Sequence, residues 1–150
     1  MPADTVSSAV RSRMMAAVKG KNTRPELAIR SALHRRGFRF RLHRKDLPGR
    51  PDLVFTGRGA VIFVHGCFWH GHDCHLFKWP KTREEFWREK IIGNQLRDQK
   101  NSEALSKEGW RQLIIWECAL KGKNRLHSEE LFRETVSWLL HGRKNSELVG

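Results

Sequence analysis

The stretch that most constrains this chain is residues 61–75, with the sequence VIFVHGCFWHGHDCH. Its four-residue apolar run is typical of a buried strand, and the loop after it holds four histidines, two of the chain's three cysteines and the pair Phe68 and Trp69. Cysteine thiolates and imidazoles are the ligands that zinc prefers. Cys67 and Cys74, together with a histidine such as His72, are close enough in the sequence to bind one ion from one loop.

A fourth ligand must come from elsewhere, and Cys118 is the only remaining cysteine. It follows a second apolar run, LIIWE at residues 113–117, which predicts another strand. One tetrahedral ion could therefore join two neighbouring strands at their ends. Spacing alone does not choose among His70, His72 and His75 as the histidine ligand, and each is equally typical of a surface position.

Composition favours a single cytoplasmic domain. A chain of 150 residues can bury a core without depending on a metal, so zinc would order the loop locally. Three cysteines without disulfide spacing favour a reducing compartment. No segment has the pattern of an export signal, and the apolar runs are far shorter than a bilayer span.

The charge predicts a polyanionic partner. The chain has 29 Lys and Arg against 16 Asp and Glu, a formal net charge of +13 and a pI near 10.5. Nucleic acid is the expected partner, because released counterions drive its association with basic proteins. An acidic membrane surface is less favoured, since no strongly apolar amphipathic helix accompanies the charge. Residues 1–22 are predicted to form a basic arm that wraps a DNA duplex. A solvated tail without a binding role is an equally favoured interpretation.

Periodicity predicts an α/β domain over residues 23–142. The capping pattern TRPE at residues 23–26 opens a helix to about residue 36, and residues 38–42, 53–55 and 61–64 alternate or run apolar as strands, the last two forming a hairpin. A second capping pattern at residues 82–85 opens a helix to residue 108, with Phe86, Ile91, Leu96 and Leu105 expected on its buried side. A strand at 110–118 and a helix from Ser128 follow, and residues 143–150 are expected to be a flexible tail.

The hairpin brings chemistry to one end of the sheet. Asp52 opens one strand and His65 closes the other, so antiparallel pairing places both at the same end. A carboxylate can hold Mg²⁺ and a neutral histidine can accept a proton from water, which together suit phosphodiester hydrolysis. Turn capping is the alternative for Asp52. For Glu26 we expect a bond back to the helix cap rather than catalysis.

Three aromatic residues have two interpretations each. Phe68 and Trp69 either cover a zinc site or insert between base pairs, as aromatic wedges do in proteins that open a base step. Trp87 either packs in the core or joins that surface.

Several motifs together resemble the very short patch repair endonucleases, the Vsr family. They are LPGRPD at residues 47–52, VIFVHGCFWHGHDCHLFKWP at 61–80, EFW at 85–87 after Arg83, and GWR to WEC across 109–118. The resemblance covers most of the chain. It implies a restriction-endonuclease-like core, a mixed central sheet flanked by helices, and a nick in one strand beside the T of a T:G mismatch, the lesion left by deaminated 5-methylcytosine.

The resemblance also implies roles for individual residues. Asp52 matches a Mg²⁺ ligand, His70 the general base, and His65 and Glu26 residues that assist at the active site. Four residues match structural zinc ligands and three match DNA-intercalating aromatics: Cys67, His72, Cys74 and Cys118, and Phe68, Trp69 and Trp87.

The chain departs from the family at two positions. Val64 stands where the family has a threonine whose backbone carbonyl contacts the Mg²⁺. Valine keeps the backbone carbonyl, but any role of the threonine hydroxyl is lost. Asp73 stands where a histidine is expected, and it need not bind metal.

The resemblance implies double-stranded DNA with a T:G mismatch as partner, a nucleoid-associated location in the cytoplasm, and mismatch-repair proteins and a repair polymerase acting around the nick. A cut in one strand needs no symmetry, so we expect a monomer. Alternatives are a restriction-type endonuclease that cuts both strands and a non-catalytic zinc module that only binds DNA. A zinc hydrolase or deaminase is weaker, because the Cys-x-x-Cys of deaminases is missing.

Overall fold

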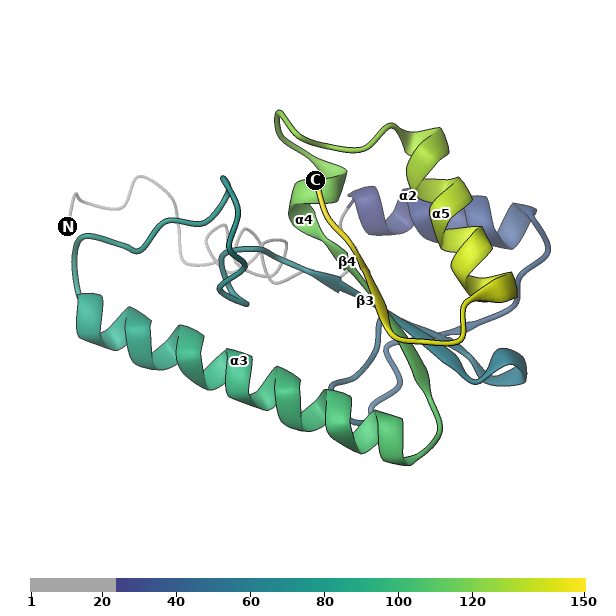
Figure 1. Cartoon of the computed structure of the whole chain (residues 1–150), viewed down its shortest axis with the longest axis horizontal. Helices are drawn as coiled ribbons and strands as arrows, with labels where there is room; N and C mark the ends of the chain where they lie inside the picture. Colours follow the sequence, from purple (N-terminus) through teal and green to yellow (C-terminus); the bar gives the residue numbers. More distant parts are fainter. Residues whose placement is uncertain (1–23) are drawn as a thin grey trace, which may run out of the picture.

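A computed structural model describes residues 24–150 (Figure 1). The expected basic arm, residues 1–22, lies outside the described residues. The predicted order of helix, three strands, helix, strand and helix is confirmed, with a short helix and a strand added near the C-terminus. The elements are α2 (Arg24–Arg35), β1 (Arg41–Leu42), β2 (Leu53–Phe55), the 3-10 turn η1 (Thr56–Arg58), β3 (Ala60–His65), α3 (Glu84–Lys107), β4 (Arg111–Trp116), α4 (Glu117–Leu120), α5 (Ser128–His141) and β5 (Ser146–Leu148).

The five strands form one mixed sheet in the order β1-β2-β3-β4-β5. β2 and β3 pair antiparallel with Leu53 opposite Ile62, which confirms the predicted hairpin. β3 and β4 run parallel and are joined by the crossover that contains α3, and β5 adds a second parallel pair at the edge. The predicted α/β class with a mixed central sheet is confirmed.

Alternation along the strands divides the core between the two faces of the sheet. On one face, Leu53, Ile62 and Ile115 pack with the apolar sides of α2 and α5. On the other, Val54 and Phe63 belong to a smaller cluster closed by Leu105 of α3. The helices accordingly lie on opposite sides of the sheet, with α3 below it in Figure 1.

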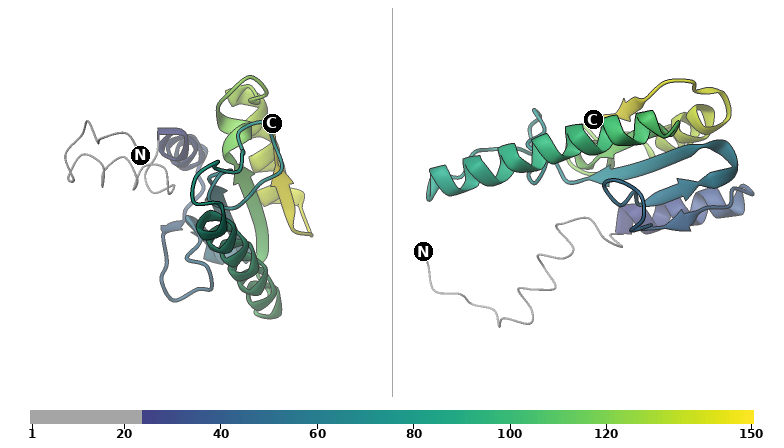
Figure 2. Two further views of the ribbon diagram at one scale, coloured as in Figure 1. Left: turned by 90° about the vertical axis from the view of Figure 1, so that its left-hand side faces the viewer. Right: turned by 90° about the horizontal axis from the view of Figure 1, so that it is seen from below.

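α3 extends well beyond the sheet, as the right-hand view in Figure 2 shows. Its 24 residues span about 36 Å, whereas the six residues of β4 span about 20 Å, so roughly half of the helix has no strand to cover. Ile91 and Leu105 are buried as predicted, but Phe86 and Leu96 are exposed, which corrects that prediction. The helix runs through Gly93 without a break, and no side chain caps its start at Arg83.

The C-terminal segment, which the polar sequence predicted to be a flexible tail, contains the strand β5. β5 pairs in parallel with β4, and Glu147 accepts a hydrogen bond from the Trp116 indole N–H at 3.1 Å. β4 also ends earlier than expected, so Cys118 lies in α4 rather than in the strand. Across residues 24–150, no helix has both the length and the apolar character needed to cross a membrane.

Candidate active site and metal centre

The β2–β3 hairpin brings Asp52 and His65 to one end of the sheet, as predicted. Asp52 directly precedes β2, and its Oδ2 accepts a hydrogen bond from the backbone N–H of Val64 at 2.6 Å. Asp52, His65 and His70 all line one pocket of about 220 Å³. The two residues on which hydrolysis would depend, Asp52 and His70, therefore face a common space.

His65 and His70 stack face to face. Their ring centroids are 3.8 Å apart with an interplanar angle of 4°, and Trp116 meets both rings edge-on. Burial, together with the charge that His70 can carry, lowers the pKa of His65 well below its usual value. His65 is therefore neutral at pH 7, and the ring of His70 packs against the face of its ring.

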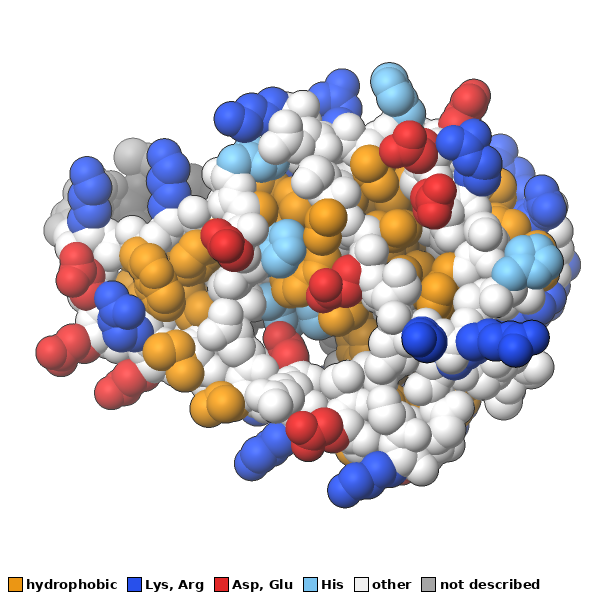
Figure 3. Space-filling model, in the orientation of Figure 1, with side chains coloured by type: hydrophobic (Ala, Val, Ile, Leu, Met, Phe, Trp, Pro, Cys, Tyr) orange, Lys and Arg blue, Asp and Glu red, His pale blue; other side chains and the backbone are white. Residues whose placement is uncertain are grey.

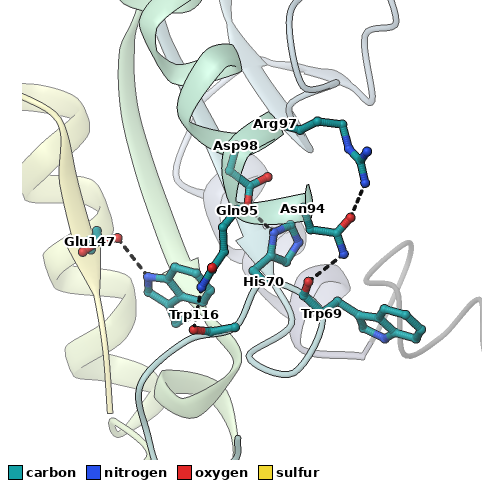
Figure 4. Close-up of polar contacts among 9 residues, drawn as sticks. Trp69, His70, Asn94, Gln95, Arg97, Asp98, Trp116 and Glu147 are labelled. Carbon is teal, nitrogen blue, oxygen red and sulfur yellow. Dashed lines mark hydrogen bonds and ion pairs between the residues drawn. The ribbon is translucent and has the colours of Figure 1, made fainter. Parts of the chain in front are cut away.

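Asp98 contacts the other side of His70, and no sequence pattern predicted this contact. Asp98 Oδ2 lies 2.5 Å from His70 Nδ1 (Figure 4). A carboxylate is an acceptor, so it favours the tautomer that carries the proton on Nδ1 and leaves Nε2 free to accept one. Asp98 was missed because it is one of many charged residues along α3, and only the fold distinguishes it.

A second missed residue, His43, lies between two carboxylates. Its Nε2 is 3.4 Å from Glu26 Oε2 and its Nδ1 is 3.4 Å from Asp52 Oδ1. Glu26 is fully buried and also lies 3.6 Å from Arg30. Glu26, His43 and Asp52 offer ligand atoms within 4.8 Å of one another, so this corner of the pocket could hold a cation. Glu26 therefore faces the candidate site; its expected cap at Thr23 lies outside the described residues.

Three cysteines and one histidine converge behind the active site. The Sγ of Cys67 and the Sγ of Cys118 lie 3.5 and 3.6 Å from Nδ1 of His72, and the ligand atoms of all four residues, Cys74 included, lie within 4.8 Å. Burial raises the pKa of the Cys67 thiol above its usual range. Of the three histidines that spacing left open, His72 is the one in this group.

Trp116 connects this cluster to the active site. The indole stacks on His72 at 4.0 Å with an interplanar angle of 8°, while its edge faces His65 and His70. Glu117, the next residue, accepts a hydrogen bond from the backbone N–H of Cys67 at 3.1 Å. Ordering the cysteine cluster therefore also orders the wall of the active site.

The aromatic residues form a cluster where the loop after β3 meets the start of α3. Trp87 lies 5.4 Å from Phe68 and 5.8 Å from Trp69 between ring centroids, and Phe68 also contacts Phe77. Figure 3 shows hydrophobic side chains gathered over this end of α3, beside charged ones. Phe86 and Trp79 at its edge are each more than 40% exposed, 43% and 42%. Exposed aromatic side chains gathered in this way are typical of binding surfaces.

Comparisons with known proteins identify the family. A sequence model described as DNA mismatch endonuclease Vsr matches residues 3–76. The DNA mismatch endonuclease Vsr of Escherichia coli is 46% identical over 137 residues, covering 91% of this chain and 88% of the relative. The chain belongs to the Vsr family.

Two other members of similar length carry the description type II nicking enzyme. V.XorIIP of Xanthomonas oryzae is 52% identical over 125 residues, which are 83% of this chain and 92% of that protein. V.NmeAIP of Neisseria meningitidis is 42% identical over 120 residues, 80% of this chain and 86% of that protein. The family expected from the sequence motifs is thereby confirmed.

Proposed function

We propose that this Vsr-family protein nicks one strand of duplex DNA beside the T of a T:G mismatch. The family and its nicking relatives support DNA strand cleavage. The observation that carries the proposal is the shared pocket of Asp52 and His70, with His70 held between His65 and Asp98. A carboxylate and an oriented imidazole facing one space are what hydrolysis of a phosphodiester needs.

Mg²⁺ fits the oxygen-rich corner of this pocket. Asp52 and the buried Glu26 supply carboxylate oxygens, the ligands that this hard cation prefers, and Val64 adds a backbone carbonyl next to the N–H that orients Asp52. We assign Asp52 and the Val64 carbonyl as ligands, with Glu26 assisting. When bound, Mg²⁺ offsets the negative charge that develops on the phosphate.

His70 acts as the general base. With its Nδ1 proton held by Asp98, its Nε2 accepts a proton from the attacking water. The water oxygen forms a bond to phosphorus as the bond to the leaving sugar oxygen breaks, and the leaving oxygen takes up a proton from solvent. The products are a phosphate and a hydroxyl at the nick. His65 is neutral and stacked on His70, so it assists by fixing the plane of the base.

Zn²⁺ fits the cluster of Cys67, His72, Cys74 and Cys118. A tetrahedral ion with bonds of about 2.3 Å to sulfur and about 2.0 Å to nitrogen holds those ligands about 3.5 Å apart. The two sulfur-to-nitrogen distances here are 3.5 and 3.6 Å. Four protein ligands close such a site to substrate, so its role is to stabilise the loop that carries His70.

We assign DNA binding to the aromatic cluster at the start of α3 and to the basic surface. Within the cluster Trp69 is buried, and Phe86 and Trp79 form the exposed edge. Phe68, Trp69 and Trp87 act as the wedge that stacks on bases beside the mismatch, where a mispaired step is the least costly to open. The net charge of +13 supplies affinity for phosphates. We assign the mixed sheet to a restriction-endonuclease-like core that acts as a monomer on one strand, with mismatch-repair proteins and a repair polymerase acting around the nick.

A strand-resolved cleavage assay tests the proposal. Duplexes with a T:G pair or a matched pair, labelled on each strand separately, are incubated with the protein and Mg²⁺. We expect one nick on the T strand of the mismatched duplex only, and none with Asp52→Ala. Equal cutting of both strands of matched DNA would establish the restriction-type alternative, and binding without any nicking would establish the non-catalytic alternative.

A further inference from the structure

One face of α3 contacts three successive residues of the loop after β3 (Figure 4). Asn94 donates from Nδ2 to the carbonyl of Trp69 at 2.8 Å, Asp98 holds the ring of His70, and Gln95 donates from Nε2 to the carbonyl of Gly71 at 3.1 Å. Residues 94, 95 and 98 lie on one side of a helix. The proposed wedge and the proposed base are thus adjacent in the chain and attached to the same helical turn.

The loop is also packed tightly against that turn. Gly71 has a φ of 59°, in the left-handed region, and a Cβ built on it would lie 2.5 Å from Gln95 Nε2 and 2.7 Å from Ile91 Cγ2. Ile91 is fully buried. The backbone therefore approaches α3 more closely than any other residue type at position 71 allows.

We propose that Asn94 and Gln95 are positioning residues that keep the His70 base in place when the Trp69 wedge is inserted into DNA. The inference rests on the proposed function, and it assigns to α3 a role beyond carrying Asp98. Without this attachment, a force on the Trp69 ring would pass through one peptide unit to His70. With it, the carbonyl between the two residues is fixed to the helix, and the helix also fixes the ring of His70.

The chain offers closely matched variants for the test. Asn94→Asp keeps the size of the side chain and an oxygen for the contact with Arg97, but it replaces the donor to Trp69 with an acceptor. Gln95→Glu removes the donor to Gly71 in the same way. Gln99→Glu is the control, because it makes the same charge change on α3 at an exposed residue whose side chain contacts Glu103 rather than the loop.

Single-turnover nicking of a T:G duplex with saturating enzyme gives the first readout. We expect Asn94→Asp to lower the rate about 10- to 100-fold, since a displacement near 1 Å costs a catalytic group about that much. Gln95→Glu should lower it about 2- to 12-fold, the equivalent of one neutral hydrogen bond. Gln99→Glu should stay within twofold of wild type. All three variants should remain folded, with urea midpoints lowered by no more than the loss of one hydrogen bond.

A double-mutant cycle with Trp69→Ala distinguishes two roles for Asn94. Asn94 either keeps His70 in place only when Trp69 is inserted into DNA, or it supports the structure at all times. Without the wedge there is no force to resist, so Asn94→Asp should cost less than threefold in the Trp69→Ala background, as coupled residues do. An equal cost in both backgrounds would overturn the inference.

A readout without DNA completes the test. In the free protein, the proton of His70 Nδ1 held by Asp98 should give a slowly exchanging downfield NMR signal in wild type and in Gln99→Glu. In the free Asn94→Asp protein we expect the signal to persist, because no DNA acts on the Trp69 ring. Its loss in the free variant would indicate a general structural role and would overturn the inference. A wild-type protein that does not nick T:G DNA would instead defeat the proposed function.

Discussion

Asp98→Asn tests the orientation of the proposed base by removing one charge and little else. The Asp98 carboxylate lies 2.5 Å from His70 Nδ1 and can only accept a hydrogen bond. Asparagine can instead present its NH₂ group to an unprotonated Nδ1. That arrangement favours the tautomer with the proton on Nε2, which cannot accept a proton from water.

The size of the effect follows from the geometry. A hydrogen bond to a charged group contributes about 1.5–3 kcal/mol, and a tenfold change in rate corresponds to about 1.4 kcal/mol, so full loss in the transition state costs about 10- to 150-fold. The Asp98 side chain is 31% exposed, and solvent reduces the contribution. We therefore expect a decrease of about 10- to 50-fold in the single-turnover nicking rate.

Glu89→Gln is the matched control for this measurement, because it removes one carboxylate from an exposed position on the same helix. It should nick within twofold of wild type, and both variants should keep the wild-type metal content. An Asp98→Asn protein that nicks within twofold of wild type would show that Asp98 does not orient the base.

Four further predictions concern the rest of the site. Cys118→Ala should abolish zinc binding, measured by elemental analysis, and lower the urea midpoint, since the ligand is buried; retained zinc would contradict the ligand assignment. Deleting residues 145–150 should lower the free energy of unfolding by about 2 kcal/mol or more, because it removes the charge-assisted bond from Trp116 and the pairing of β5 with β4, whereas a flexible tail would give no change. Trp69→Ala should weaken binding to a T:G duplex about 5- to 100-fold in a fluorescence titration, from lost base stacking; equal affinity would exclude the wedge. His43→Ala should raise the Mg²⁺ concentration needed for half-maximal nicking, because His43 contacts Asp52, whereas Arg44→Ala, which breaks only the pair with Asp46, should not.

The sequence predicted those features that depend on local pattern. The hairpin followed from two apolar runs around a Gly-rich turn, and its antiparallel pairing then placed Asp52 and His65 together. Cys67 and Cys74 could be assigned to a metal cluster because few cysteines compete for the role. The choice of His72 came only from family resemblance, since its neighbours in sequence are equally near.

The features that were missed depend on contacts between distant segments. His43 and Asp98 have no distinguishing neighbours in the sequence, and each becomes part of the site only because a loop or a helix crosses the end of the sheet. The polar residues of β5 carry no strand pattern; their pairing is provided by the free edge of β4. Leu96 has the spacing of a buried residue, but the sheet ends before reaching it.

Because α3 is longer than the sheet, one helix contacts both the core and the candidate site. Near its C-terminus, Leu105 closes the core under the sheet, so this part contributes to stability. In the middle, Asn94 and Asp98 hold the loop that carries His70, and at the N-terminus Trp87 contacts the aromatic cluster. A helix shortened to the length of β4 would still complete the core, but it would lose both functional segments. The proposed function therefore assigns DNA recognition and the support of the base to the part of α3 that lies beyond the core contact of Leu105.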